Sequence, residues 1–186
     1  MNAFTDEQKV VIYRVKSKIV LHFQEFKLKP WYNSNLPWDK VYLSGGAIAS
    51  LFQNEKPKDW DLYFEDDFTQ SIFHNYLTSA SVKEYIEDVN EKYQEYVGVD
   101  GKMITSNSIT MKGGDSFIIC MNGKPKDVKQ KFDYVHCTPH YDIMDMKLYI
   151  SSKQYQAIEN KKLIVNNQNS ITTYRKNKFI ERGYTE

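Results

Sequence analysis

Two carboxylates one residue apart, shortly after a pair of glycines, constrain this chain more than any other feature. Asp59 and Asp61 flank Trp60 in a short apolar segment, and Gly45-Gly46 follows an earlier one. Side chains at i and i+2 of a strand share a face, so we expect the two carboxylates side by side. The opposite face then carries Trp60, Leu62 and Phe64. Because adjacent carboxylates repel, the pattern favours a site for Mg²⁺ or Mn²⁺, which bind carboxylate and phosphate oxygens.

The first third of the chain predicts a helix, a strand, a helix and a second strand. Thr5 and Gln8 have the spacing of a capping box, and apolar residues then recur at helical spacing as far as Phe26. The elements that follow are a buried strand over 40–44, a helix over 46–52 and a strand over 60–64.

Helical and hairpin patterns fill the rest of the chain. Residues 66–96 are mostly helical in pattern, with a break at 78–81. Three strands are then expected over 104–111, 116–121 and 132–137. From Ser151 onward the pattern is helical, and Ser170 and Gly183 are placed to cap the last helix. We therefore expect an α+β fold: a mixed β-sheet flanked by helices over 1–140, and a small helical C-terminal extension over 141–186.

An isolated acid in the last expected strand is the candidate third carboxylate. Asp133 lies in the segment 132–137, where alternation places it on one face with Val135 and Cys137. A buried carboxylate without a partner is costly, so we expect Asp133 to be paired unless it faces solvent from a half-exposed strand. His136 falls on the opposite face, which favours a packed core histidine.

The spacing of these elements resembles that of the nucleotidyltransferase superfamily, the fold shared by DNA polymerase beta, poly(A) polymerases and CCA-adding enzymes. That family has a hydrophobic residue and Gly-Gly, a spacer, an acid–hydrophobic–acid triplet and a later acid. Here Leu43–Gly46, residues 47–58, Asp59–Asp61 and Asp133 match these parts in turn. The resemblance covers roughly residues 38–138 and implies that the three acids are catalytic and bind the metal.

Two further stretches bear on the comparison with CCA-adding enzymes. Ala49-Ser50 stands where those enzymes have an Arg-Asp pair, and residues 173–184 resemble a basic-aromatic stretch near the end of their catalytic core. The chain is therefore similar to a minimal form of the fold.

The expected nucleotide contacts come from the glycine turn and the last helix. Glycines let the backbone approach a phosphate closely, so Ser44, Gly45 and Gly46 are assigned to phosphate binding. A basic stripe at i, i+3 and i+7 of the last helix contains Arg175, Lys178 and Arg182. Its first two members are the candidate nucleotide contacts, and the stripe could also meet an RNA backbone. The interpretation that the pattern favours is a solvated face whose cations complement the helix dipole.

Composition restricts the partners and the compartment. With 25 Lys and Arg against 24 Asp and Glu, the net charge of +1 gives no overall field for nucleic acid. Cys120 and Cys137 lie in apolar runs and are expected to be buried thiols. The first thirty residues carry charges throughout, and no apolar stretch is long enough to span a membrane, so we expect a cytoplasmic protein without a membrane partner.

The resemblance implies a metal-dependent nucleotidyltransferase that moves a nucleoside monophosphate from an NTP such as ATP to an acceptor hydroxyl. The acceptor candidates are a tRNA-like RNA 3′ end, a protein side chain and a small molecule. One alternative is a catalytically silent module that binds a nucleotide or a protein on the same fold. Another is a toxin-type or defence-type nucleotidyltransferase. Fold alone does not choose among these functions.

Overall fold

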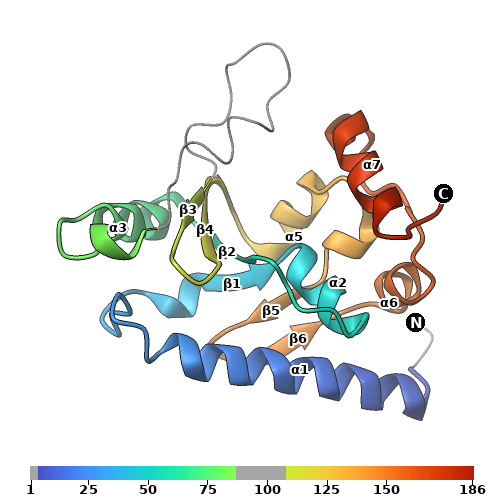
Figure 1. The fold of residues 1–186 in the computed structure, drawn as a ribbon, viewed down its shortest axis with the longest axis horizontal. Coiled ribbons are helices and arrows are strands. Elements are labelled where there is room, and N and C mark those ends of the chain that lie inside the picture. The colour runs from blue at the N-terminus through green and yellow to red at the C-terminus, as the bar shows by residue number, and fades with distance from the viewer. Residues whose placement is uncertain (1–3, 87–107) are drawn as a thin grey trace.

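One six-stranded sheet organises residues 4–86 and 108–186, the part of the chain that the computed structural model describes (Figure 1). The strands are β1 (Val41–Ser44), β2 (Trp60–Phe64), β3 (Ser108–Thr110), β4 (Asp115–Asn122), β5 (His140–Asp142) and β6 (Lys147–Tyr149). They lie in the order β3-β4-β2-β1-β5-β6. β2 pairs with β4 in parallel and the other neighbours are antiparallel, so the sheet is mixed, as expected.

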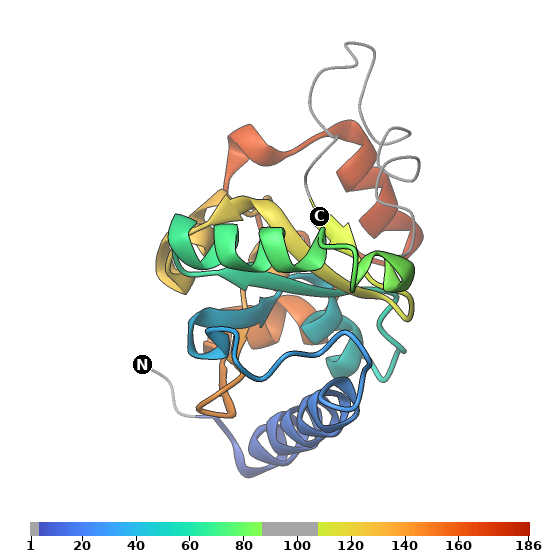
Figure 2. The same cartoon turned by 90° about the vertical axis from the view of Figure 1, so that its left-hand side faces the viewer.

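Helices lie on both sides of this sheet (Figure 2). The α-helices are α1 (Asp6–Phe26), α2 (Gly46–Phe52), α3 (Asp67–Leu77), α5 (Pro125–Val128), α6 (Ser152–Glu159) and α7 (Thr173–Glu181). Short 3-10 helices occur at Trp38–Lys40, Lys83–Tyr85, Lys129–Lys131, Val135–Cys137 and Gln168–Ser170. No helix in the described part of the chain combines the length and apolar character needed to cross a bilayer.

The N-terminal helix α1 forms as its sequence predicts. The hydroxyl of Thr5 accepts the backbone N–H of Gln8 at 3.2 Å, and the Gln8 side chain accepts that of Thr5 at 3.1 Å, which confirms the capping box. The face of α1 toward the sheet buries Val15, Ile19, Phe23 and Phe26. Each such side chain stabilises the fold by about 1.5–3 kcal/mol.

Alternation along β1 and β2 separates two apolar clusters. Leu43 and Leu62 join the cluster beneath α1, whereas Tyr42 and Tyr63 join a second cluster that includes Phe179 of α7. Asp61 precedes Leu62 and therefore lies on the α7 face of the sheet. Trp60, Leu62 and Phe64 all pack with the cluster on the opposite side, as the sequence predicts.

Most of the expected elements are confirmed. α2 and β2 have the expected bounds, β1 begins one residue later, and α3 ends at the expected break. The expected hairpin is present as β3 and β4. The rest of the expected helical stretch, beyond residue 86, and the start of the first hairpin strand lie outside the described residues.

The predicted strand over residues 132–137 is wrong. This segment is irregular as far as Tyr134, which makes an isolated bridge to Val165, and it continues as the 3-10 helix Val135–Cys137. Both edges of β1, β2 and β4 are already paired within the sheet, so the segment has no adjacent edge to join. Alternating residues alone do not make a strand without such a partner.

The C-terminal residues also differ from the expectation. The sheet continues through β5 and β6, so residues 141–149, expected in a helical extension, belong to the sheet region instead. The last helix takes its N-cap from Thr172 rather than Ser170, because the Thr172 hydroxyl accepts the N–H of Arg175 at 3.1 Å. Gly183 follows the helix with φ of 82°, as expected of a residue that ends one.

Candidate active site

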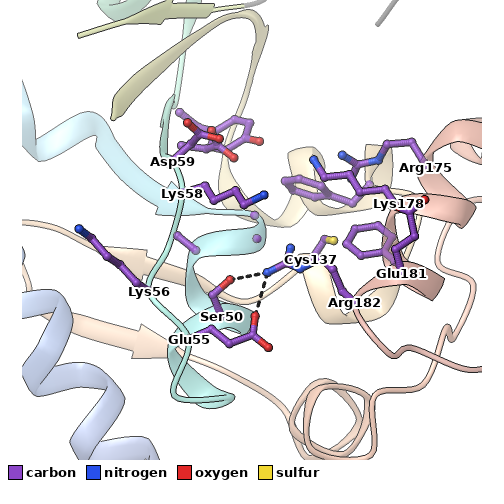
Figure 3. Close-up of a pocket in the computed structure, with 17 residues that line it drawn as sticks. Ser50, Glu55, Lys56, Lys58, Asp59, Cys137, Arg175, Lys178, Glu181 and Arg182 are labelled. Carbon is purple, nitrogen blue, oxygen red and sulfur yellow. Dashed lines mark hydrogen bonds and ion pairs between the residues drawn. The ribbon is translucent and has the colours of Figure 1, made fainter. Parts of the chain in front are cut away.

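A pocket of about 350 Å³ opens between α2, the start of β2 and α7 (Figure 3). Charged side chains of both signs line it. They are Glu55, Asp59, Asp61 and Glu181, and Lys56, Lys58, Arg175, Lys178 and Arg182. Figure 3 shows Arg175 and Lys178 of α7 on one side and Lys58 and Asp59 on the other. The fold thus places the acid pair opposite the basic stripe.

The Gly45 turn packs its backbone against the acid pair. Gly45 has φ of 87° and ψ of −154°, a conformation that essentially only glycine adopts. Its N–H donates to the carbonyl of Cys137 at 3.2 Å. A Cβ atom at Gly45 would lie 3.0 Å from Oδ2 of Asp61. Glycine is therefore required both for the backbone angles and for the space beside the Asp61 carboxylate.

The two carboxylates differ in their surroundings. Burial and the neighbouring charge of Asp59 raise the pKa of Asp61 to about 6, although Arg175 and Lys178 oppose this change. Asp59 comes just before β2 and is exposed at the rim of the pocket. Asp61 is thus costly to ionise, and the Asp59 carboxylate lies beside it.

This pair of donors fits a hard divalent cation. Mg²⁺ is commonly held by one or two carboxylates together with substrate phosphates, and Asp59 and Asp61 supply that number. Among residues 4–86 and 108–186, no group of three His, Cys, Asp or Glu side chains is arranged to hold a metal ion. That Asp59, Asp61 and Asp133 together hold a metal ion stays a prediction.

Asp133 has a guanidinium as its partner instead. Its side chain is 3% exposed, and Oδ2 accepts Nε–H of Arg175 at 2.7 Å while Oδ1 accepts Nη2–H at 3.3 Å. Oδ1 also accepts the N–H of Tyr134 at 2.9 Å. Arg175 lines the pocket and Asp133 does not. The expectation that a buried Asp133 would be paired is confirmed.

Each arginine of the basic stripe is tied to a separate part of the fold. Burial lowers the pKa of Arg175, but the hydrogen bonds to Asp133 together with the negative charge of Asp133 and the other acidic groups around it raise the pKa above the ordinary value. Arg182 donates from Nη2 to Oγ of Ser50 at 2.8 Å and to Oε2 of Glu55 at 3.2 Å (Figure 3). The interpretation of a fully solvated face does not describe these two side chains.

Lys178 lies between the two arginines on α7. Desolvation and the charges of Arg175 and Arg182 lower its pKa, whereas Asp61 and Asp59 across the pocket raise it. The described residues give Lys178 no hydrogen bond or ion pair of its own. Its side chain lines the pocket together with that of Arg175.

Ser44 is turned away from the pocket. Its side chain is buried, and its hydroxyl donates to the carbonyl of Pro139 at 2.8 Å. Of the expected nucleotide contacts, Gly45, Gly46, Arg175 and Lys178 line the pocket. The Ser44 hydroxyl instead donates its proton within the fold and ties the end of β1 to Pro139.

Sequence reasoning missed Ser50 and Glu55, which bind Arg182 from the α2 side of the pocket. The available signal was the Ala49-Ser50 pair at the position where CCA-adding enzymes have Arg-Asp. In this chain the Ser50 hydroxyl accepts a hydrogen bond from Arg182, which is distant in the sequence.

Two buried residues beside the site belong to the core. Burial lowers the pKa of His136 to about 3 and raises that of the Cys137 thiol to about 12. A neutral imidazole among Tyr134, Phe179 and Tyr184 confirms the expected core histidine. A thiol that stays protonated is a poor nucleophile, so Cys137 is a packing residue, as expected. The side chain of Cys120 lies outside the described part.

A family model matches most of the chain. The model described as Gabija anti-defense 2 family protein matches residues 14–161. No curated protein sequence matches this chain.

Solved structures of CCA-adding enzymes share the fold. The Thermotoga maritima CCA-adding enzyme complexed with tRNA-CCA superposes with a TM-score of 0.50 and 18% identity, over 89% of this chain and 37% of that chain. The complex of a CCA-adding enzyme with CTP gives the same TM-score and identity, over 91% of this chain and 37% of that chain. The chain thus spans 37% of the length of these structures. Their likeness shows a minimal nucleotidyltransferase-like α+β fold.

Proposed function

Because this chain belongs to the Gabija anti-defense 2 family and has a nucleotidyltransferase-like fold, we propose that it transfers a nucleoside monophosphate from an NTP to an acceptor hydroxyl, with Mg²⁺ or Mn²⁺ bound. The carrying observation is the Asp61 carboxylate, whose pKa is raised to about 6 beside Asp59 and against the Gly45 turn. A bound cation would favour the charged form of both carboxylates. The cations of α7 face the same space, which suits a polyanionic phosphate chain.

In this proposal, acidic side chains bind the cation and basic side chains bind the phosphates. Asp59 and Asp61 would hold the cation, which when bound neutralises phosphate charge and polarises the reacting oxygens. Lys178 donates to phosphate oxygens as a compact point charge, and Arg175 offers the guanidinium edge that Asp133 leaves free. The Gly45-Gly46 turn lets the backbone approach the phosphates closely.

Transfer forms a bond between the acceptor oxygen and the α-phosphorus and breaks the bond to pyrophosphate, and the proton of the acceptor hydroxyl passes to solvent water. Such reactions depend mainly on positioning and on charge stabilisation. The pocket contributes both, because the acid pair and the basic side chains are fixed on different elements of the fold.

A catalytically silent nucleotide-binding module is the second candidate. It is favoured by the ion pair between Asp133, the third acid of the family pattern, and Arg175. Such a module binds the metal–nucleotide complex and releases it unchanged.

The family description supplies the setting for either candidate. It favours the defence-type reading, in which the nucleotide chemistry or nucleotide binding acts against Gabija. The acceptor would then be an RNA end or a protein side chain, within a cytoplasmic setting. The near-neutral net charge favours a small contact with any nucleic acid over a long one.

The test is incubation of the full chain with each α-labelled NTP, Mg²⁺ or Mn²⁺, and cellular RNA plus protein extract. Label transferred by the wild type and not by the Asp59→Asn/Asp61→Asn double variant supports transfer and identifies the acceptor class. Metal-dependent NTP binding without transfer supports the silent module. Absence of NTP binding by a folded protein contradicts both.

The anti-defense role is tested in cells that carry Gabija. Suppression of the defense by the wild type and not by the double variant would link the acid pair to that role. Equal suppression by both would separate the role from the pocket.

A further inference from the structure

Two carboxylates from different parts of the fold each bind one arginine of the basic stripe. Asp133 binds Arg175 through both of its oxygens, and Glu55 binds Arg182. Arg175 also lies over the ring of Phe179, with 5.1 Å between its Cζ atom and the ring centroid. A planar guanidinium held by a bidentate carboxylate and an aromatic ring has little rotational freedom.

Asp133 is itself held rigidly by the surrounding backbone. Its Oδ1 accepts the N–H of Tyr134, and its carbonyl accepts the N–H groups of Asn166 and Asn167 at 2.8 and 3.1 Å. The Asn166 side chain donates to the neighbouring carbonyl of Phe132 at 2.8 Å. The carboxylate that orients Arg175 is therefore anchored to the segment that leads into α7.

The hydrogen bonds of Asp133 leave part of the guanidinium uncommitted. Nε and Nη2 bind Asp133, and Nη1 makes no hydrogen bond within the described residues. Arg175 lines the pocket with its side chain 37% exposed, while Asp133 behind it is 3% exposed. Any ligand in the pocket thus meets Arg175 rather than Asp133.

We propose that Asp133 is a positioning residue that aims Arg175 at a phosphate in the pocket, and that it is not a metal ligand. The inference rests on the proposed function, because it assigns a role at the same site. The metal is then held by Asp59 and Asp61, and the substrate phosphates supply the further oxygens. Removing Asp133 leaves metal binding intact and removes the fixed orientation of the guanidinium.

The first test follows the ion pair itself and does not depend on the proposed function. In the full chain labelled with ¹⁵N-arginine, the Nε–H signal of Arg175 is identified by its loss in Arg175→Lys. We expect slow hydrogen exchange of this signal in the wild type and fast exchange in Asp133→Asn. Glu186→Gln is the matched control, because it removes a carboxylate that pairs with Lys176 on the same helix. An unchanged signal in Asp133→Asn overturns the proposal.

The second test separates positioning from metal binding. Titration with Mn²⁺ alone is expected to give the wild-type affinity for Asp133→Asn and at least about tenfold weaker binding for Asp61→Asn, since ligand removal costs at least that much. Equal weakening by the two variants overturns the proposal. If the wild type binds no Mn²⁺, the metal site of the proposed function fails, while the arginine signal still decides the ion pair.

The third test uses inorganic tripolyphosphate in EDTA, with circular dichroism as the check of folding. Asp133→Asn makes the pocket more positive, so charge alone would strengthen anion binding. We expect about fivefold weaker binding instead, because the oriented donors are lost. The same substitution in an Arg175→Lys background should then add no further loss. Unchanged or tighter binding by Asp133→Asn overturns the proposal. If Asp133→Asn does not fold, the same measurement is made with Asp133→Glu.

Discussion

Asp61→Asn is expected to stabilise the metal-free protein at neutral pH. The folded-state pKa of Asp61 is about 6 against an ordinary value of 3.8. A tenfold change in an ionisation constant corresponds to about 1.4 kcal/mol, so ionising Asp61 in the folded state costs up to about 3 kcal/mol. Partial exposure of the side chain to solvent makes this an upper bound. An amide at this position carries no such cost.

The pH dependence has a definite sign. Because the folded-state pKa is raised, the contribution of Asp61 to stability is fully present below about pH 4 and is lost as the pH rises through about 6. The two proteins should therefore differ little at pH 4, and the variant should be more stable at pH 8. For a chain of this length, about 3 kcal/mol raises the Tm by roughly 6–12 °C.

Urea and thermal unfolding in EDTA between pH 4 and 8 measure this difference. Asp59→Asn removes the same charge from an exposed position and should give a smaller gain. Added Mn²⁺ should raise the Tm of the wild type more than that of Asp61→Asn, since the variant is expected to bind the ion more weakly. A variant that is less stable than the wild type at pH 8, or a difference that does not change with pH, would refute the reasoning.

Four other substitutions test separate parts of the fold. Gly45→Ala should destabilise by about 1–3 kcal/mol in urea titrations, because its φ is 87° and a Cβ would lie 3.0 Å from Oδ2 of Asp61. Gly46→Ala has nothing within 4 Å of its Cβ and should stabilise the helix by about 0.5–1 kcal/mol; a loss equal to that of Gly45→Ala would contradict the role of the turn. The folded-state pKa of His136 is about 3, below its ordinary value of 6.5. The unfolded protein therefore binds a proton that the folded protein does not, and His136 lowers the stability as the pH falls from about 6.5 toward 3. His136→Phe should flatten acid unfolding over that range, and an unchanged acid transition would argue against this source. Thr5→Ala should lower stability by about 1 kcal/mol through loss of the capping hydroxyl, and no change in the urea midpoint would show that the cap is dispensable.

Local signals predicted the part of the site that lies on consecutive elements. The Gly-Gly turn, the helix after it and the acid pair at the start of β2 are separated by short connections, so spacing alone places them together. The capping box at Thr5 was readable for the same reason, since both partners lie within one helical turn.

The partners of α7 were not readable from the sequence. Arg175 meets Asp133 and Arg182 meets Glu55 across sequence separations of 42 and 127 residues. Only tertiary packing decides such pairs, and the same packing decided that residues 132–137 are not a strand. β5 and β6 were missed because each has only three residues, too few for a periodic signal.

Contacts between α2 and the last residues of the chain set the order in which the pocket can assemble. Gln53 donates to the hydroxyl of Tyr184 at 2.9 Å across 131 residues, beside the Arg182 contacts with Ser50 and Glu55. Loops of this length close slowly, because the chain loses conformational entropy before the stabilising contacts form. During synthesis, the acid pair and the glycine turn leave the ribosome early. The Arg182 end of the basic stripe can dock on α2 only after residue 184 has also emerged. The protein therefore gains its complete charge pattern in a late folding step.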